Sequence, residues 1–425
     1  MSKPIKLIGE PIRSPPENRL FPDWNSAWWQ AAAQVMWRNA GSRSAMMNVL
    51  KNGICDGCSR SVIGSTDHQG ETHRCLPQLQ RLLFNTQSIF SEADVCDIRH
   101  LRQHSRQALQ SLGRVGYPFI YRPGDRGLTR TSWSEALGLI GESVRKIPAH
   151  RQMYLAYSES STNEGYYAFA KMARLMGSNN IHLCHSKVHR KGVSILERSL
   201  GVRTPTISFS DVLGTDLLLL VGCTYGPYLE DIIKQAQNNG ARVVLLYTKD
   251  RSSERLLSLV DEKIAIHSGA EKDVVLGVAK LIWEWQQHDE EFVRCHTQGV
   301  ERLYRQLSDI SLNRCSTLSG VAVSQIDWLA TLIARAKTMV TLYGEAAVSN
   351  DEVFVATKHI LNIHLLKGAI GKPHSGVFPF WPQSGVYGAM ESGIDPMQYV
   401  EGRSITEENA QWLSDIWGEK ISAVP

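Results

Sequence analysis

Short apolar runs alternate with amphipathic segments through the second half of the chain. The clearest run lies at residues 216–222, where positions 217–221 are all aliphatic. An unbroken apolar run of this length predicts a strand that is buried on both faces, as in a parallel sheet. Further strands are predicted at residues 153–157, 242–247 and 338–343.

Helices are predicted between these strands, where apolar residues recur at helical spacing. They cover residues 76–87, 162–176, 186–200, a stretch that ends at 239, most of 270–337, and 352–366. Strands that alternate with helices predict a doubly wound, mainly parallel α/β fold. Residues 367–402 are dense in glycine and proline, which predicts loops. Near the start, a packed aromatic helix is predicted from four tryptophans: Trp24, Trp28, Trp29 and Trp37.

The composition is that of a globular protein. Of the 425 residues, 43% are hydrophobic and 21% are charged, enough for two or three domains with substantial cores. The net charge of +4 is too small to indicate nucleic-acid binding. The first residues lack the apolar core of a secretory signal, and the longest apolar runs are far shorter than the roughly 20 residues that span a bilayer. We therefore expect a cytoplasmic protein without a membrane span.

Three cysteines near the start are candidate metal ligands. Cys55, Cys58 and Cys75 have the spacing C-x2-C-x16-C, and Gly57 permits the tight turn that presents two thiolates to one metal. In a chain without a secretory signal, cysteines are better explained as reduced thiols or ligands than as disulfides. An iron–sulfur cluster is the favoured hypothesis, and zinc or unligated thiols are the alternatives. No fourth ligand is evident.

Cys184 is a second candidate, because it lies just before the helix predicted to begin at residue 186. A thiolate near a helix N-terminus is stabilised by free backbone amides and by the helix dipole. Cys184 could therefore bind a metal or, with His185 beside it, act as a nucleophile. Taken alone, such a cysteine is more often a buried packing residue.

Two glycine-containing segments could lie against a cofactor. Gly222 ends the clearest strand, and the loop that follows it to Gly226 could let backbone amides approach a phosphate. It lacks the full G-x-G-x-x-G pattern, so a plain strand-to-helix turn is the alternative. Residues 368–376 and 383–388 are also rich in glycine and could wrap around a large planar cofactor.

Six segments, taken in order, resemble the formate-dehydrogenase-like molybdopterin oxidoreductases. They are NGICDGCS, SSTNEGYYAFAKMARLMGSNNI, LCHS, GTDLLLLVG, LKGAIGKPHSGV and QSGVYGAMESGIDP. The resemblance covers about residue 50 to the end. It implies a small N-terminal iron–sulfur module followed by α/β domains, a molybdenum bis(molybdopterin guanine dinucleotide) cofactor, and a 4Fe-4S or 3Fe-4S cluster.

The resemblance also implies roles for particular residues. Cys55, Cys58 and Cys75 correspond to cluster ligands, Cys184 to the molybdenum ligand, and His185 to a neighbour that handles the substrate proton or orients the substrate. Lys358 stands where formate-oxidising members carry an arginine that binds the carboxylate. The loops that hold the dinucleotides correspond to segments that contain Gly222, Cys223, Gly226, Lys249, Asp273, Ser384, Gly385, Val386 and Gly388.

The function that the resemblance implies is oxidation of a small substrate such as formate at molybdenum. Electrons would leave through the iron–sulfur cluster to an acceptor protein. The alternative is a truncated, catalytically silent scaffold or partner protein of the same family. A hydrolase or transferase that uses Cys184 and His185 is a third hypothesis.

Four parts are predicted along the chain. They are an N-terminal extension (residues 1–50), a small iron–sulfur domain (51–130), a Rossmann-like pterin-binding domain (131–345), and a partial second α/β region with glycine-rich cofactor loops (346–425). Members of the resembled family continue into a further C-terminal domain that closes over one dinucleotide. Because the sequence ends at Pro425, we expect this chain to lack that domain or to receive it from a partner.

Overall fold

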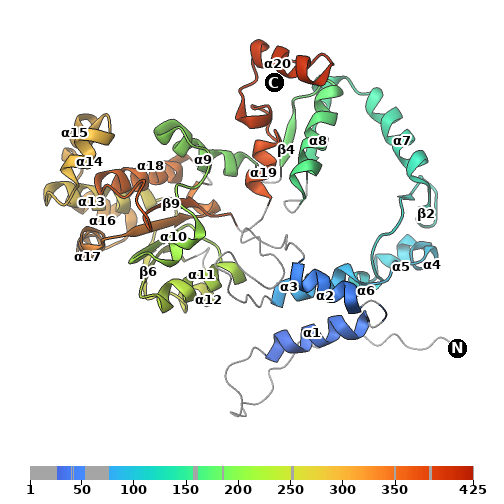
Figure 1. The fold of residues 1–425 in the computed structure, drawn as a ribbon, viewed down its shortest axis with the longest axis horizontal. Coiled ribbons are helices and arrows are strands. Elements are labelled where there is room, and N and C mark those ends of the chain that lie inside the picture. The colour runs from blue at the N-terminus through green and yellow to red at the C-terminus, as the bar shows by residue number, and fades with distance from the viewer. Residues whose placement is uncertain are drawn as a thin grey trace. The chain divides into compact units, whose positions relative to one another are not determined.

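The computed structural model describes residues 26–39, 41, 43–52, 76–156, 161–183, 186–249, 253–348, 351–381 and 385–424. These residues fall into two compact units that divide between residues 152 and 153 (Figure 1). The first unit is mostly helical, and the second contains the parallel sheets. The four boundaries predicted from the sequence stay a prediction.

The first unit has a small apolar core. Its helices are α1 (Ser26–Arg38), α2 (Arg43–Asn52), α3 (Leu76–Asn85), α4 (Glu92–Val95), α5 (Ile98–Leu101), α6 (Arg106–Ser111), α7 (Trp133–Arg145) and η2 (Ala149–Arg151). Strands β1 (Phe119–Ile120) and β2 (Thr129–Arg130) pair antiparallel. Helices α1 and α3 pack together through Ala31, Val35 and Leu79.

The predicted aromatic helix forms as α1, but Trp37 does not pack as expected. Its side chain is 81% exposed. Helix α1 turns Ala31 and Val35, one helical turn apart, into the core, so Trp37 lies on a different face. The packing prediction is therefore wrong for Trp37, and Trp24 lies outside the described residues.

The second unit is built on a five-stranded parallel sheet, in the order β7-β6-β5-β8-β9. The strands are β5 (Leu217–Val221), β6 (Arg242–Thr248), β7 (Glu262–Ile266), β8 (Met339–Tyr343) and β9 (Gly376–Pro379). This arrangement confirms the predicted α/β class. The hydrophobic pattern does not predict β7 or β9, because β7 begins with two charged residues and β9 contains glycine and proline.

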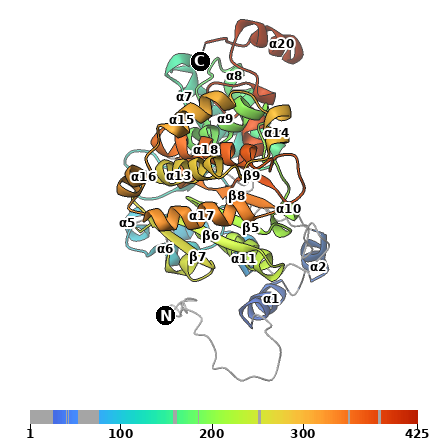
Figure 2. The ribbon, with the colours of Figure 1, turned by 90° about the vertical axis from the view of Figure 1, so that its left-hand side faces the viewer.

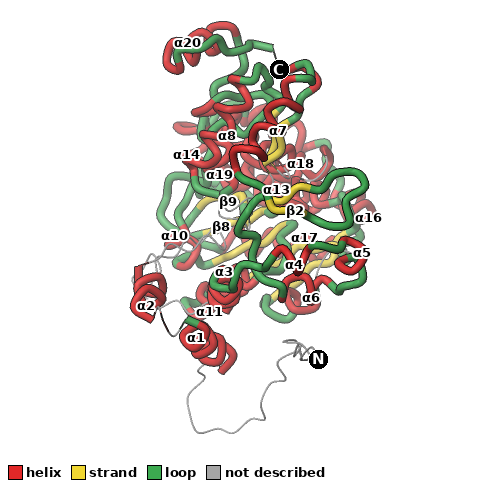
Figure 3. The backbone as a smooth tube through the Cα atoms, turned by 90° about the vertical axis from the view of Figure 1, so that its right-hand side faces the viewer, coloured by secondary structure: helices red, strands yellow, loops and turns green. Residues whose placement is uncertain are grey.

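Helices cover both faces of this sheet, as Figures 2 and 3 show. Leu217, Leu219 and Val221 belong to one apolar core and Leu218 and Leu220 to the other, which explains the unbroken apolar run. Each of these side chains is at most 4% exposed, and burial stabilises a side chain of this kind by roughly 2 kcal/mol. One face packs against α13 (Glu271–Glu284), α17 (Val323–Arg335) and α18 (Asp351–Leu366), and the other against α10 (Phe209–Leu213) and α11 (Pro227–Asn238).

A second, smaller parallel sheet pairs β3 (Tyr154–Ala156) with β4 (Ile181–Leu183). Helix α8 (Asn163–Leu175) connects the two strands, and α9 (Ser186–Leu200) follows β4. Buried Arg174 on α8 donates hydrogen bonds to the carbonyls of Gly393 and Gln398, at 2.9 and 2.8 Å. Burial lowers the pKa of this guanidinium to about 10. The C-terminal segment is thereby bound to α8.

The region predicted as loops at residues 367–402 contains regular structure. It includes β9, α19 (Val386–Glu391) and η4 (Val400–Gly402), and α20 (Glu407–Trp417) follows it. The loop prediction is wrong for these elements. Glycine is needed there for close packing as well as for turns: a Cβ on Gly388 of α19 would lie 1.9 Å from the side-chain oxygen of Asn163 on α8.

The remaining described helices lie along the second unit. They are α12 (Glu254–Leu257), α14 (Glu290–His296), α15 (Val300–Ser308), α16 (Leu312–Ser319) and the short η3 (Glu345–Val348). Within the described ranges, no single helix is long and apolar enough to cross a membrane. Helices α16 and α17 pass that test only as a pair bent by 107°.

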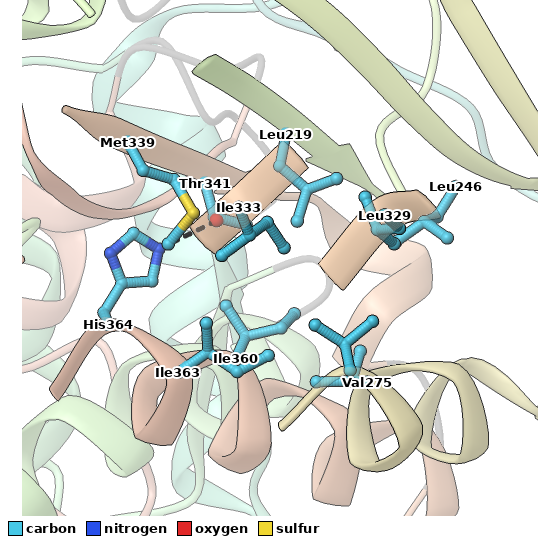
Figure 4. Close-up of a pocket in the computed structure, with 11 residues that line it drawn as sticks. Leu219, Leu246, Val275, Leu329, Ile333, Met339, Thr341, Ile360, Ile363 and His364 are labelled. Carbon is cyan, nitrogen blue, oxygen red and sulfur yellow. Dashed lines mark hydrogen bonds between the residues drawn. The ribbon is translucent and has the colours of Figure 1, made fainter. Parts of the chain in front are cut away.

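A small apolar cavity lies between the sheet and its covering helices (Figure 4). Its volume is about 10 Å³, room for no more than a single water molecule, so it is too small for a substrate. His364 lines it, with Nε2 2.9 Å from the Thr341 hydroxyl oxygen. Burial lowers the pKa of His364 to about 3. The imidazole is therefore a neutral part of the core.

We expect acid to destabilise the fold through His364. Its folded pKa of about 3 lies below the roughly 6.5 of an unfolded histidine, so the unfolded chain takes up the proton first as the pH falls. Above pH 6.5 the residue makes no pH-dependent contribution. Below it, the free energy of unfolding should fall by up to about 1.4 kcal/mol per pH unit. His364→Gln removes this titration, so urea unfolding should show a shallower pH dependence than in the wild type.

The matched control is His296→Gln, because His296 is exposed on α14. That variant should keep the wild-type pH dependence. An unchanged slope in His364→Gln would contradict the assignment of His364 as a buried neutral histidine.

Candidate functional site

The carboxyl ends of β5 and β8 are the point where the strand order of the sheet reverses. The chain continues from β5 to β6 on one side, whereas β8 lies on the other side of β5. Open parallel sheets bind ligands beyond the strand ends at such a point. Val221 pairs with Tyr343 at the last position of the two strands, so Gly222 and Gly344 begin the candidate site.

These two strand ends approach each other backbone to backbone. The Gly344 N–H donates to the Val221 carbonyl at 2.9 Å. A Cβ on Gly222 would lie 2.3 Å from the backbone nitrogen of Ala347, and a Cβ on Gly344 would lie 2.5 Å from the carbonyl oxygen of Gly222. Gly222 also has φ +61°, a left-handed conformation that favours glycine. No larger residue fits at either position without displacing the backbone.

Three side chains from distant parts of the sequence meet at this edge. His189 on α9 is fully buried, and its Nε2 lies 3.1 Å from Oε1 of Glu345, which begins η3 just after β8. The centroid of the imidazole ring lies 4.8 Å from that of the Trp381 ring. Trp381 follows β9, and its side chain is 1% exposed. The Tyr343 hydroxyl donates a hydrogen bond to the Gly192 carbonyl at 2.8 Å. This hydrogen bond also holds α9 against β8.

The sequence patterns did not single out His189, Glu345 or Trp381. Glu345 could have been found, because it comes two residues after a predicted strand and the carboxyl ends of parallel strands share one edge. His189 carries no such signal: it lies within a predicted helix, and only the packing of α9 against η3 brings it to Glu345.

Helix α11 begins at the end of the β5 loop, the segment of residues 222–226 that follows strand β5. Gly226 is its N-cap and offers no side chain to its first N–H groups, and Pro227 follows at the first helical position. N–H groups at the positive end of a helix dipole favour an anion. Glu230 in the same turn is bound by Arg255, Lys234 and Tyr225, and the hydrogen bond from Arg255 is the main cause that lowers its pKa to about 2.

Six of the residues predicted for the site lie outside the described residues: Cys55, Cys58, Cys75, Cys184, His185 and Ser384. In the sequence, Cys184 and His185 come between the end of β4 and the start of α9. Within the described ranges no group of three or more His, Cys, Asp or Glu side chains is arranged to hold a metal ion. The ligand roles of these residues stay predictions.

Cys223 turns its thiol into the core. Its Sγ lies 3.4 Å from the carbonyl oxygen of Leu342 on β8, and burial raises its pKa to about 12. A thiol with this pKa stays protonated and is a poor metal ligand or nucleophile. Any contact of Cys223 with a cofactor would therefore be made through its backbone.

The remaining predicted residues lie at several places in the second unit. Lys249 is exposed directly after β6, and Asp273 is buried in the first turn of α13, after β7. Burial, and secondarily the Asp273 carboxylate, raises the pKa of Cys315. Lys358 is exposed on α18, between buried neighbours. Asp273 lies in the helical stretch predicted from residue 270, and the cofactor role implied for it stays a prediction.

The predicted cofactor segment at residues 385–388 forms the start of α19. Gly385 is the N-cap, Val386 is fully buried in the core, and Gly388 faces Asn163 of α8. The Tyr387 hydroxyl donates to the Pro379 carbonyl at 2.8 Å, at the end of β9. This segment therefore begins at the same edge of the sheet as Gly222 and Gly344.

A profile of the family described as molybdopterin oxidoreductase matches residues 114–412. The matched range includes both strand ends of the candidate site. The chain belongs to the molybdopterin oxidoreductase family.

Over the aligned segments, several curated relatives are about one-quarter identical to this chain. Formate dehydrogenase H of Escherichia coli is 25% identical over 317 residues, which cover 72% of this chain and 44% of that protein. The assimilatory nitrate reductase catalytic subunit of Bacillus subtilis is 26% identical over 340 residues, with shares of 77% and 46%. The chain thus spans less than half the length of these relatives.

Acetylene hydratase of Pelobacter acetylenicus has a similar structure. The TM-score is 0.55 at 15% sequence identity, over 75% of this chain and 43% of that protein. At this identity the likeness supports the fold alone.

We expect Gly222→Ala to destabilise the protein by roughly 2 kcal/mol or more. The variant combines the strain of a left-handed alanine with a clash against the backbone of Ala347. Gly201→Ala is the matched control, since Gly201 also has positive φ, at +72°, but a Cβ there meets nothing within 4 Å. Thermal or urea unfolding should show a clearly larger loss for Gly222→Ala. Equal losses would contradict the close approach of the strand ends.

Proposed function

We propose that the chain forms the metal-binding part of a molybdopterin-dependent oxidoreductase that acts on a small substrate such as formate. One observation carries the proposal: the family match includes the paired glycine ends of β5 and β8, at the point where a parallel sheet binds ligands. Relatives named for formate and for nitrate are consistent with a small substrate.

The described residues at this edge fit a pterin dinucleotide. Glycine at Gly222 and Gly344 lets the loop after β5 pack directly against the start of η3, so that backbone groups from both lie together at this edge. Gly226 places no capping side chain over the first turn of α11, and in this proposal a phosphate lies at that helix N-terminus. In this proposal these three glycines, Lys249 and the segment that begins at Gly385 hold the cofactor, in its bis guanine dinucleotide form.

The residues around the β4 to α9 connection would handle the substrate. In this proposal the bound molybdenum supplies the two-electron redox chemistry. Cys184 holds the metal through its thiolate, and His185 accepts or returns the substrate proton. Lys358 offers a positive charge to a carboxylate, although lysine lacks the two-pronged geometry of arginine.

The N-terminal cysteines complete the proposal. Cys55, Cys58 and Cys75 would bind an iron–sulfur cluster that passes electrons to an acceptor protein. We place the protein in the cytoplasm, because reduced cysteines of this kind persist there.

Metal and pterin analysis of the purified protein tests this proposal. We expect molybdenum and pterin together with iron in the wild type. Cys184→Ala should keep its iron, because the two sites use different cysteines. The pterin dithiolenes would still hold molybdenum, so X-ray absorption should show one sulfur neighbour fewer at that metal. Cys295→Ala, which removes an exposed thiol of α14, is the matched control and should keep both metals.

The outcomes separate the hypotheses. Iron without molybdenum or pterin in the wild type would favour the silent scaffold. A protein without either metal would contradict the proposal. An unchanged number of sulfur neighbours of molybdenum in Cys184→Ala would remove that residue from the metal site.

A further inference from the structure

The pair formed by His189 and Glu345 links a buried position at the carboxyl edge of the sheet to solvent. The His189 side chain is 0% exposed, whereas the Glu345 side chain is 27% exposed. Their hydrogen-bonding atoms lie 3.1 Å apart. A buried ring is thus joined directly to a carboxylate that water can reach.

The chemistry of the two groups sets the direction of this hydrogen bond. An ionised carboxylate can only accept, so Nε2 of His189 carries the hydrogen and donates it to Oε1 of Glu345. Histidine and carboxylate groups are the side chains that most readily exchange protons in neutral solution. The pair therefore joins a buried donor to an acceptor that solvent can reach.

The surroundings keep the ring in place. Trp381 lies against the imidazole at 4.8 Å, and the Tyr343 hydroxyl holds the next turn of α9 through Gly192. The adjacent Arg190 lies 3.7 Å from the buried carboxylate of Asp395. The Glu345 carboxylate lies within hydrogen-bonding distance of Nε2, at 3.1 Å.

We propose that His189 and Glu345 form a proton path between the interior of the candidate site and solvent. When a second proton reaches the ring, the Nε2–H bond breaks, an O–H bond forms on Glu345, and the carboxylic acid gives the proton to water. Only a proton moves, and no group is oxidised or reduced. The use of this path in turnover rests on the proposed function, since substrate oxidation at this edge would release protons there.

Hydrogen exchange at the His189 ring distinguishes a proton path from a purely structural link. Glu345→Gln keeps a hydrogen-bond acceptor of the same size but cannot take up a proton. If Glu345 carries the proton to solvent, this variant should slow exchange of the Nε2 hydrogen about tenfold or more. If the pair only holds α9 in place, weakening it should leave the exchange rate unchanged or raise it.

The measurement uses the purified chain with 15N-labelled histidine, followed by NMR, and needs no substrate. Glu284→Gln, an exposed carboxylate on α13, is the control and should leave the exchange rate at His189 unchanged. Glu345→Asp retains a titratable carboxylate and should restore exchange in part. Exchange that is unchanged or faster in Glu345→Gln overturns the proposal.

This result is independent of the proposed function. Metal analysis can fail while the exchange of His189 still depends on Glu345, and then the path exists without a molybdenum site. A protein that contains molybdenum but shows no effect of Glu345→Gln would keep the proposed function and lose the proton path.

Discussion

The close approach of the ends of β5 and β8 is the constraint on which the rest of the site depends. Gly222 and Gly344 allow the two backbones to meet without intervening side chains. This contact places the β5 loop, η3 and the start of α9 around one edge. The same contact has a cost, because glycine is conformationally free in the unfolded chain. The buried aliphatic residues of β5, packed on both faces, offset that cost and hold the strand ends in place.

Much of the fold could be predicted from the sequence, because burial leaves a direct mark on it. Strand β5 is covered on both faces, and its sequence is accordingly an unbroken aliphatic run. Strands β7 and β9 contain fewer apolar residues than β5. They are held mainly by pairing with β6 and β8, so no local sequence pattern indicates them. The same holds for α19, where the glycines that indicated loops serve close packing against α8.

The candidate site could be predicted only in part. Gly222 and Gly226 follow a clear strand, and strand ends point to ligand edges of parallel sheets. The pairing of His189 with Glu345 spans more than 150 positions in the sequence, and it depends on how α9 packs against η3. Cys223 illustrates the opposite case: its place in the loop indicated a cofactor contact, but its thiol points into the core.

The structure and the family match together lead us to propose that a pterin cofactor binds at the carboxyl ends of β5 and β8. Backbone hydrogen exchange in cofactor-loaded and cofactor-free protein, followed by mass spectrometry, tests it directly. We predict slower exchange on loading at residues 222–226 and 344–345, with no change at residues 286–290, where the chain passes from α13 to α14. Slower exchange confined to segments outside these strand ends would contradict the account.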